Sequence, residues 1–141
     1  MHIPTFSLFS AISELFVTAG VFYVIRRNWT RSPFPFALFL TVALFEALVN
    51  VMYMASRSAA ASAPGTKDVL STGMKIAYAS HGLLSLIAYL VFVVLGVLAY
   101  QEQKAGRWFF PERPKLTWSF LVLWVVSIGS GEVIFTLRYL V

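Results

Sequence analysis

The sequence predicts an all-α protein, an integral membrane four-helix antiparallel bundle in which residues 1–141 form a single transmembrane domain. Two observations predict this fold class. Hydrophobic residues make up 59% of the chain and charged residues only 12%, whereas a soluble domain has roughly 25% charged residues. Four apolar runs also reach about 20 residues, the length that a helix needs to cross the hydrocarbon core of a bilayer.

The first two predicted helices cover residues 5–25 and 34–54. The first run ends at the letters "RRN". Pro33 and Pro35 stand at the beginning of the second run, where proline is tolerated because the first turn of a helix does not need its N–H groups. The connection of residues 26–33 is so short that the two helices must be antiparallel neighbours.

The third and fourth predicted helices cover residues 74–100 and 116–140. Ser71 and Thr72 precede the third, and hydroxyl side chains of this kind cap helix N-termini. Residues 55–73, "ASRSAAASAPGTKDVLSTG", are rich in small and polar residues, which predicts a loop between the second and third helices.

The connection of residues 101–115, "QEQKAGRWFFPERPK", is the most charged stretch of the chain. It is short, so the helices on its two sides are also expected to be antiparallel. Its aromatic segment, Trp108-Phe109-Phe110, is expected to lie in the membrane interface or to dock on a partner, since amphipathic aromatic rings favour that level.

Lysine and arginine predict the orientation of the bundle. The connections 26–33 and 101–115 carry seven of these residues, and the opposite side carries four. Cytoplasmic loops of membrane proteins have an excess of Lys and Arg. Both termini are therefore predicted outside, and the two basic connections in the cytoplasm, of a bacterial-type inner membrane. The net charge of +5 lies at the ends of apolar runs, which favours the lipid bilayer as partner and not nucleic acid.

Each predicted helix carries one ionisable residue within its apolar run: Glu14, Glu46, His81 and Glu132. Counted from the outer boundary, all four lie seven to nine residues inside, or roughly 10–14 Å deep at 1.5 Å per residue. Asn50 follows Glu46 on the same helical face. The sequence therefore predicts an intramembrane polar layer in the outer half of the bundle, made of these four residues and Asn50, that faces the protein interior.

Three roles are open for this layer. Its members can hold the helices together by hydrogen bonds, form a proton path or a polar site beside a partner's cofactor, or bind a metal or haem. His81 is the candidate haem or metal ligand, and the identity of any metal is open. The chain has no cysteine, which excludes thiolate metal sites and covalent c-type haem attachment.

The segment "SIGSGEVIF", residues 127–135, surrounds the last of these carboxyls. Gly129 and Gly131 would let a neighbouring helix approach closely. Glu132 is predicted to accept or share a hydrogen bond across the bundle with His81 on the preceding antiparallel helix.

The second half of the chain reads "YASHGLLSLIAYLVFVVLGVLAYQEQKAGR" and later "LTWSFLVLWVVSIGSGEVIFTLRYL". A histidine early in the third helix, a basic connection, then tryptophan and a Ser-Gly pair resemble a family of small four-helix bacterial membrane proteins of uncharacterised domain type. That family includes a haem–copper oxidase maturation factor. The resemblance covers residues 78–140, and His81 and the Ser130-Gly131 pair match its pattern.

The expected function is that of a non-catalytic integral membrane accessory subunit or assembly factor of a larger respiratory or photosynthetic electron-transfer complex. The chain shows no nucleotide motif and little loop in which to build a substrate site, so it is not expected to be an enzyme. One alternative is a haem- or metal-binding membrane redox protein that uses the polar layer. A second alternative is a small proton-coupled transporter.

Overall fold

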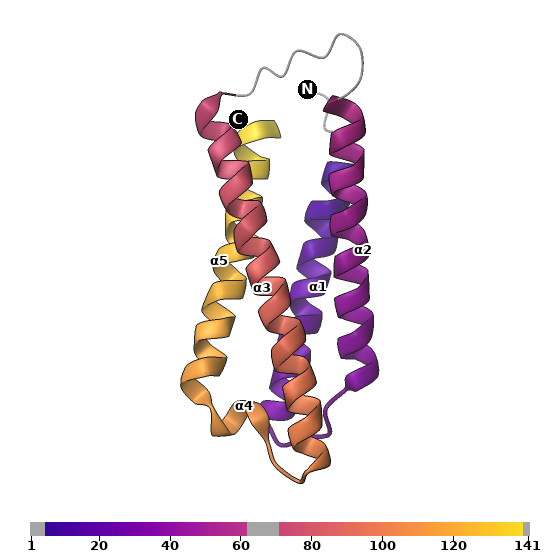
Figure 1. Ribbon diagram of the computed structural model, residues 1–141, viewed down its shortest axis with the longest axis vertical. Helices are drawn as coiled ribbons and strands as arrows, with labels where there is room; N and C mark the ends of the chain where they lie inside the picture. Colours follow the sequence, from indigo (N-terminus) through magenta and orange to yellow (C-terminus); the bar gives the residue numbers. More distant parts are fainter. Residues whose placement is uncertain (1–4, 62–70, 140–141) are drawn as a thin grey trace.

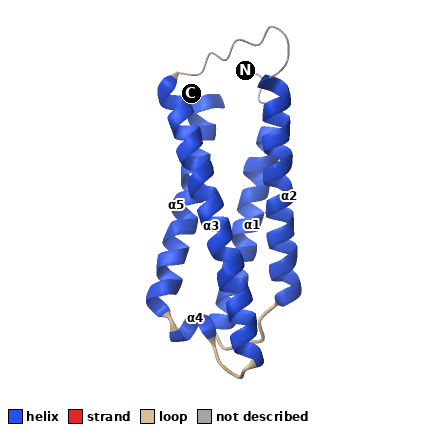
Figure 2. Cartoon of the chain, viewed as in Figure 1, coloured by secondary structure: helices blue, strands red, loops and turns tan. Residues whose placement is uncertain are grey.

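The computed structural model describes residues 5–61 and 71–139, and within these ranges every element of secondary structure is a helix (Figures 1 and 2). The prediction of an all-helical chain without strands is confirmed for these residues. The five helices are α1 (Thr5–Trp29), α2 (Phe36–Ala61), α3 (Thr72–Lys104), α4 (Phe109–Glu112) and α5 (Pro114–Tyr139).

The long helices extend beyond several predicted ends. Residues 55–61, predicted as loop, continue α2, and α3 runs four residues past its predicted end at residue 100. Residues 62–70, the rest of that predicted loop, and residue 140 lie outside the described residues. Ser71 caps α3 by accepting a hydrogen bond from the Met74 backbone N–H at 3.3 Å. Just beyond α3, Gly106 adopts φ +76°, a conformation that favours glycine after a helix.

Four of the described helices are long and apolar enough to cross a membrane: α1, α2 through Ser56, α3 and α5. They run along the long axis of the molecule (Figure 1). The most extensive contacts join α1 to α2 and α3 to α5, and fewer contacts join one pair to the other. The short connections and α4 lie at one end, here named the α4 end, and the start of α1 and the end of α5 lie at the other (Figure 1).

Helix α4 was not predicted, and its aromatic residues are not at a surface. Phe109 and Phe110 are buried, so the expectation that they lie in the membrane interface or dock on a partner is wrong. The Phe110 backbone N–H donates to Asn28 Oδ1 at 3.1 Å, and Thr117 Oγ1 donates to the Phe110 carbonyl at 3.0 Å. These bonds satisfy backbone groups of the short helix and fold it inward against α1 and α5.

The half of the bundle near the α4 end is filled by aromatic rings. Phe92 contacts Phe39 edge-on, with 5.2 Å between ring centroids, and it also contacts Phe120 and Trp124. These four side chains are each 2% exposed, and they come from α2, α3 and α5. Phe39 lies directly over Gly96 of α3, so that a Cβ atom at that position would overlap the Phe39 ring. We call this group the aromatic plug.

The close approach of Phe39 to Gly96 predicts a large effect of one methyl group. Gly96→Ala should lower the free energy of unfolding by roughly 1–3 kcal/mol, because overpacking forces the ring or the helix to move. Gly82→Ala on the same helix is the matched control, since no atom lies within 4 Å of its added Cβ. That control should be neutral or gain up to about 1 kcal/mol from helix propensity. Thermal unfolding in detergent measures both variants, and equal midpoints would contradict the packing described here.

Candidate functional site

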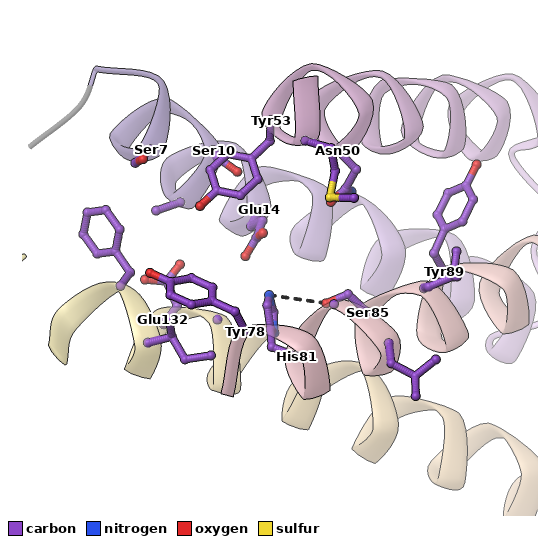
Figure 3. A pocket seen from close by; sticks show the side chains of 18 of the residues that line it. Ser7, Ser10, Glu14, Asn50, Tyr53, Tyr78, His81, Ser85, Tyr89 and Glu132 are labelled. Atoms are coloured by element: carbon purple, nitrogen blue, oxygen red, sulfur yellow. Dashed lines mark hydrogen bonds between the residues drawn. The ribbon is translucent and has the colours of Figure 1, made fainter. Parts of the chain in front are cut away.

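The candidate site is a cavity between the four long helices, in the half of the molecule away from the α4 end. Its volume is about 750 Å³. Its walls come from residues 7–14 of α1, 47–54 of α2, 78–89 of α3 and 131–139 of α5 (Figure 3). Four residues of the predicted polar layer line it: Glu14, Asn50, His81 and Glu132. The fifth, Glu46, is buried and contacts Asn50.

His81 is oriented by serine side chains. Its Nδ1 lies 2.9 Å from Ser130 Oγ, and the Ser130 hydroxyl donates to the Ser127 carbonyl at 2.7 Å. With that hydroxyl proton on the Ser127 carbonyl, Ser130 Oγ accepts from His81 Nδ1–H, so the lone pair of the neutral imidazole is on Nε2. Nε2 lies 3.5 Å from Ser85 Oγ, and Ser85 also lines the cavity (Figure 3).

Gly131 makes room for the imidazole ring. A Cβ atom at this position would lie 2.8 Å from His81 Cε1 and 3.1 Å from Nε2, which is closer than real Cβ contacts allow. The prediction that Gly131 permits a close approach is confirmed. No atom lies within 4 Å of a Cβ built on Gly129, so for that residue the same prediction is wrong within this chain.

The predicted hydrogen bond between Glu132 and His81 is not formed. His81 Nδ1 turns to Ser130, and Glu132 Oε1 is buried without a hydrogen-bond partner in the described part of the chain. The reason is the direction in which each of these residues of α5 points around the helix axis. Successive residues are about 100° apart on a helix, so Ser130 and Glu132 lie on opposite flanks of Gly131, and the ring above Gly131 is turned toward only one of them.

Two more carboxyl groups of the predicted polar layer come from α1 and α2. Glu14 points toward His81 from α1 (Figure 3), and its Oε2 lies 3.6 Å from the position that a Cβ would take at Gly131. It lies within electrostatic range of both Glu46 and Glu132. Glu46 is 7% exposed and its Oε1 accepts from Asn50 Nδ2 at 2.8 Å, while its Oε2 has no partner among the described residues.

Tyrosines complete the lining, although they were not predicted as members of the polar layer. Tyr53, Tyr78, Tyr89 and Tyr139 all line the cavity. Arg138 Nη1 donates to the Tyr78 hydroxyl at 2.8 Å, and Tyr89 donates to the Ala43 carbonyl at 3.1 Å. The spacing of Tyr78, His81, Ser85 and Tyr89 along one face of α3 is the sequence signal that places both rings beside the histidine.

The chemistry available at the site is that of carboxyl, imidazole and phenol groups in a largely apolar enclosure. Within residues 5–61 and 71–139, no three His, Cys, Asp or Glu side chains are arranged to hold a metal ion. His81 Nε2 carries the lone pair that a haem iron or a metal would use, and its orientation through Nδ1 is typical of ligating histidines.

Comparisons with known proteins found no relative. No protein-family model matches the chain, no curated protein is similar to it, and no solved structure matches its fold.

The position of the His81 ring predicts that Gly131 is intolerant of a side chain. Gly131→Ala should push the ring away, weaken its bond to Ser130 and lower the free energy of unfolding by roughly 1–3 kcal/mol. Gly129→Ala, on the same helix with open space around its added Cβ, should leave stability and ring unchanged. Thermal unfolding and the imidazole ¹⁵N resonances of His81 measure the two effects. If the His81 resonances are the same in both variants, the ring does not lie over Gly131.

Proposed function

We propose that the chain is an integral membrane protein whose four long helices cross the bilayer as an antiparallel bundle. The large apolar side chains on the outer surface support this proposal, because a soluble monomer rarely exposes contiguous apolar patches beyond a few hundred Å². Each long helix contributes to that surface. Side chains that are more than half exposed and do not line the cavity described above include Leu15 and Phe16 on α1, Leu44 and Leu48 on α2, Ile76 and Val94 on α3, and Trp118 and Val122 on α5.

The orientation that the charges favour puts both termini outside a bacterial-type inner membrane and the connections 26–33 and 101–115 in the cytoplasm. The supporting asymmetry is seven Lys and Arg residues on the two connections against four on the other side. Two of the seven, Arg107 and Arg113, share Glu102 as an ion-pair partner. This pairing does not weaken the argument, because the bias of Lys and Arg, and not net charge, correlates with topology.

In this membrane the chain acts as a non-catalytic accessory subunit or assembly factor of a larger electron-transfer complex, respiratory or photosynthetic. The observation that carries this function is the contact of His81 with Ser130 across Gly131. These residues are the features of the sequence that resemble the family of small four-helix membrane proteins that includes a haem–copper oxidase maturation factor. They lie 49 residues apart in the sequence and form one hydrogen-bonded unit at 2.9 Å.

A second candidate function is that of a haem- or metal-binding membrane redox protein with His81 as ligand. The observation that favours it is the tautomer of His81, which directs an unprotonated Nε2 toward Ser85 at the cavity wall. Haem would supply electron transfer there, and the chain would hold it through one imidazole. A third candidate, a small proton-coupled transporter, is favoured by the carboxyl groups of Glu14 and Glu132 in the same cavity.

The orientation predicts which end of the molecule an impermeant reagent reaches. The chain has no cysteine, so single cysteines report without background. In intact cells a membrane-impermeant maleimide should label Thr72→Cys, at the start of α3, and should label Ala105→Cys only after permeabilisation. Both positions are exposed, which makes them a matched pair. Labelling of Ala105→Cys alone in intact cells would reverse the topology.

The subunit proposal predicts that the tagged chain, extracted from native membranes in mild detergent, comigrates with a large complex. Ser130→Ala removes the hydrogen-bond partner of His81 and should reduce the amount of mature complex. Ser56→Ala, an exposed serine on α2, should not. A chain that migrates alone under all mild conditions would contradict the proposal. If that isolated chain shows a haem spectrum or bound metal that His81→Ala abolishes, the redox function takes its place, and flux in liposomes would indicate the transporter.

A further inference from the structure

The cavity has the size and composition of a small-molecule site. Sites for small ligands enclose roughly 300–1,000 Å³ and are mostly apolar with a few polar groups, and this cavity encloses about 750 Å³. Aliphatic side chains such as Leu83, Leu86 and Ile134 line it together with the tyrosines and carboxyl groups. The aromatic plug closes the bundle on the side of the α4 end, so the cavity ends there.

The lining of the cavity carries carboxyl groups and, among the described residues, no lysine or arginine. Glu14 and Glu132 are the carboxyl residues that line it. Arg138 lies outside the lining and donates its hydrogen bond to Tyr78. A carboxylate that leaves water needs a cation or several donors nearby, so the ionised form of either carboxyl group calls for a cation in the cavity.

Unpartnered carboxyl oxygens give independent support. Glu132 Oε1 and Glu46 Oε2 are both buried without a hydrogen-bond partner among the described residues. Glu46 is 93% buried, since only 7% of it is exposed, and Asn50 joins its other oxygen to the cavity wall. An unsatisfied buried acceptor lowers stability, and more so when the group is charged. A ligand that brings a donor or a positive charge into the cavity would satisfy Glu132 Oε1, because Glu132 lines the cavity and Glu46 does not.

The aromatic lining suits the same kind of ligand. Four tyrosines line the cavity, and the faces of aromatic rings attract cations within about 6 Å of the ring centroid. Arg138 already lies 5.4 Å from the ring centroids of Tyr78 and Tyr139, which shows that rings at this end accept a cation and leaves the ring of Tyr89 for a ligand. The hydroxyl of Tyr89 is already used on the Ala43 carbonyl, so this residue offers its ring and not its hydroxyl. The combination of ring faces, carboxyl groups and aliphatic walls suits a positive charge attached to an apolar body.

We propose that the cavity binds a lipophilic organic monocation, such as a protonated amine or a quaternary onium group. Its charged centre lies between Glu14 and Glu132, and its apolar part contacts the tyrosines and aliphatic walls. The inference does not depend on the proposed subunit function, because residues of this chain line the described part of the cavity without a partner.

Equilibrium dialysis of the purified full chain in detergent tests this site with tetraphenylphosphonium as the probe. The probe should bind saturably, with one ion per chain. Glu14→Gln and Glu132→Gln should each weaken binding by roughly tenfold or more, since each removes one charge without changing the shape of the side chain. Glu112→Gln is the matched control: it removes an exposed carboxylate on α4, outside the cavity, and it should leave the affinity unchanged.

Tetraphenylborate, which has nearly the same shape and the opposite charge, separates charge recognition from apolar partition. It should neither bind saturably nor displace the cation. If it binds as tightly as the cation, or if the Glu14 and Glu132 variants retain full affinity, the cavity is a site for neutral apolar ligands and the proposal is wrong. Should either Gln variant fail to fold, the comparison of the two ions on the unchanged chain decides the question. Binding is measured without any partner complex, so its loss is distinguishable from failure of the subunit proposal.

Discussion

The packing of Phe39 against Gly96 is the contact on which the architecture depends. The helices form two closely packed pairs, α1 with α2 and α3 with α5, and contacts between the pairs are fewer. Phe39 joins the pairs because the missing Cβ of Gly96 lets its ring lie against the α3 backbone. Phe92, Phe120 and Trp124 then fill the space around that ring. On the side away from the α4 end, the cavity occupies the space between the helices.

The polar groups lie where this packing ends. An ionisable group within a membrane span costs about 2.5–3.5 kcal/mol on insertion scales, so it has to face the protein interior or a cavity. Trp124, a member of the aromatic plug, donates its indole N–H to Thr18 Oγ1 at 3.1 Å, and this bond joins the edge of the plug on α5 to α1. On the plug side of it the core is aromatic and aliphatic, and on the other side Glu14, His81 and Glu132 share one enclosure.

The sequence was sufficient to predict the four long helices and the grouping of four polar residues. Length and apolarity predict four long helices, and counting residues along them places Glu14, Asn50, His81 and Glu132 at one level, where the structure finds a shared cavity. Counting residues does not give the rotation of each helix about its own axis, so it could not show that His81 contacts Ser130 and not Glu132. Helix α4 was missed because it is only four residues long and its burial depends on Asn28, 82 positions earlier in the sequence.

The hydrogen bonds of the site indicate how far a proton could pass through the bundle in this conformation. From His81 they pass to Ser85, and from Ser85 Oγ to Ser127 Oγ at 3.0 Å. The next buried side chain along α5 is Trp124, whose indole N–H is already bonded to Thr18 and whose ring belongs to the plug. Among the described side chains the bonds therefore stop at the aromatic plug. A proton that follows these bonds therefore does not cross the bundle in this conformation, which suits a binding or positioning role better than an open channel.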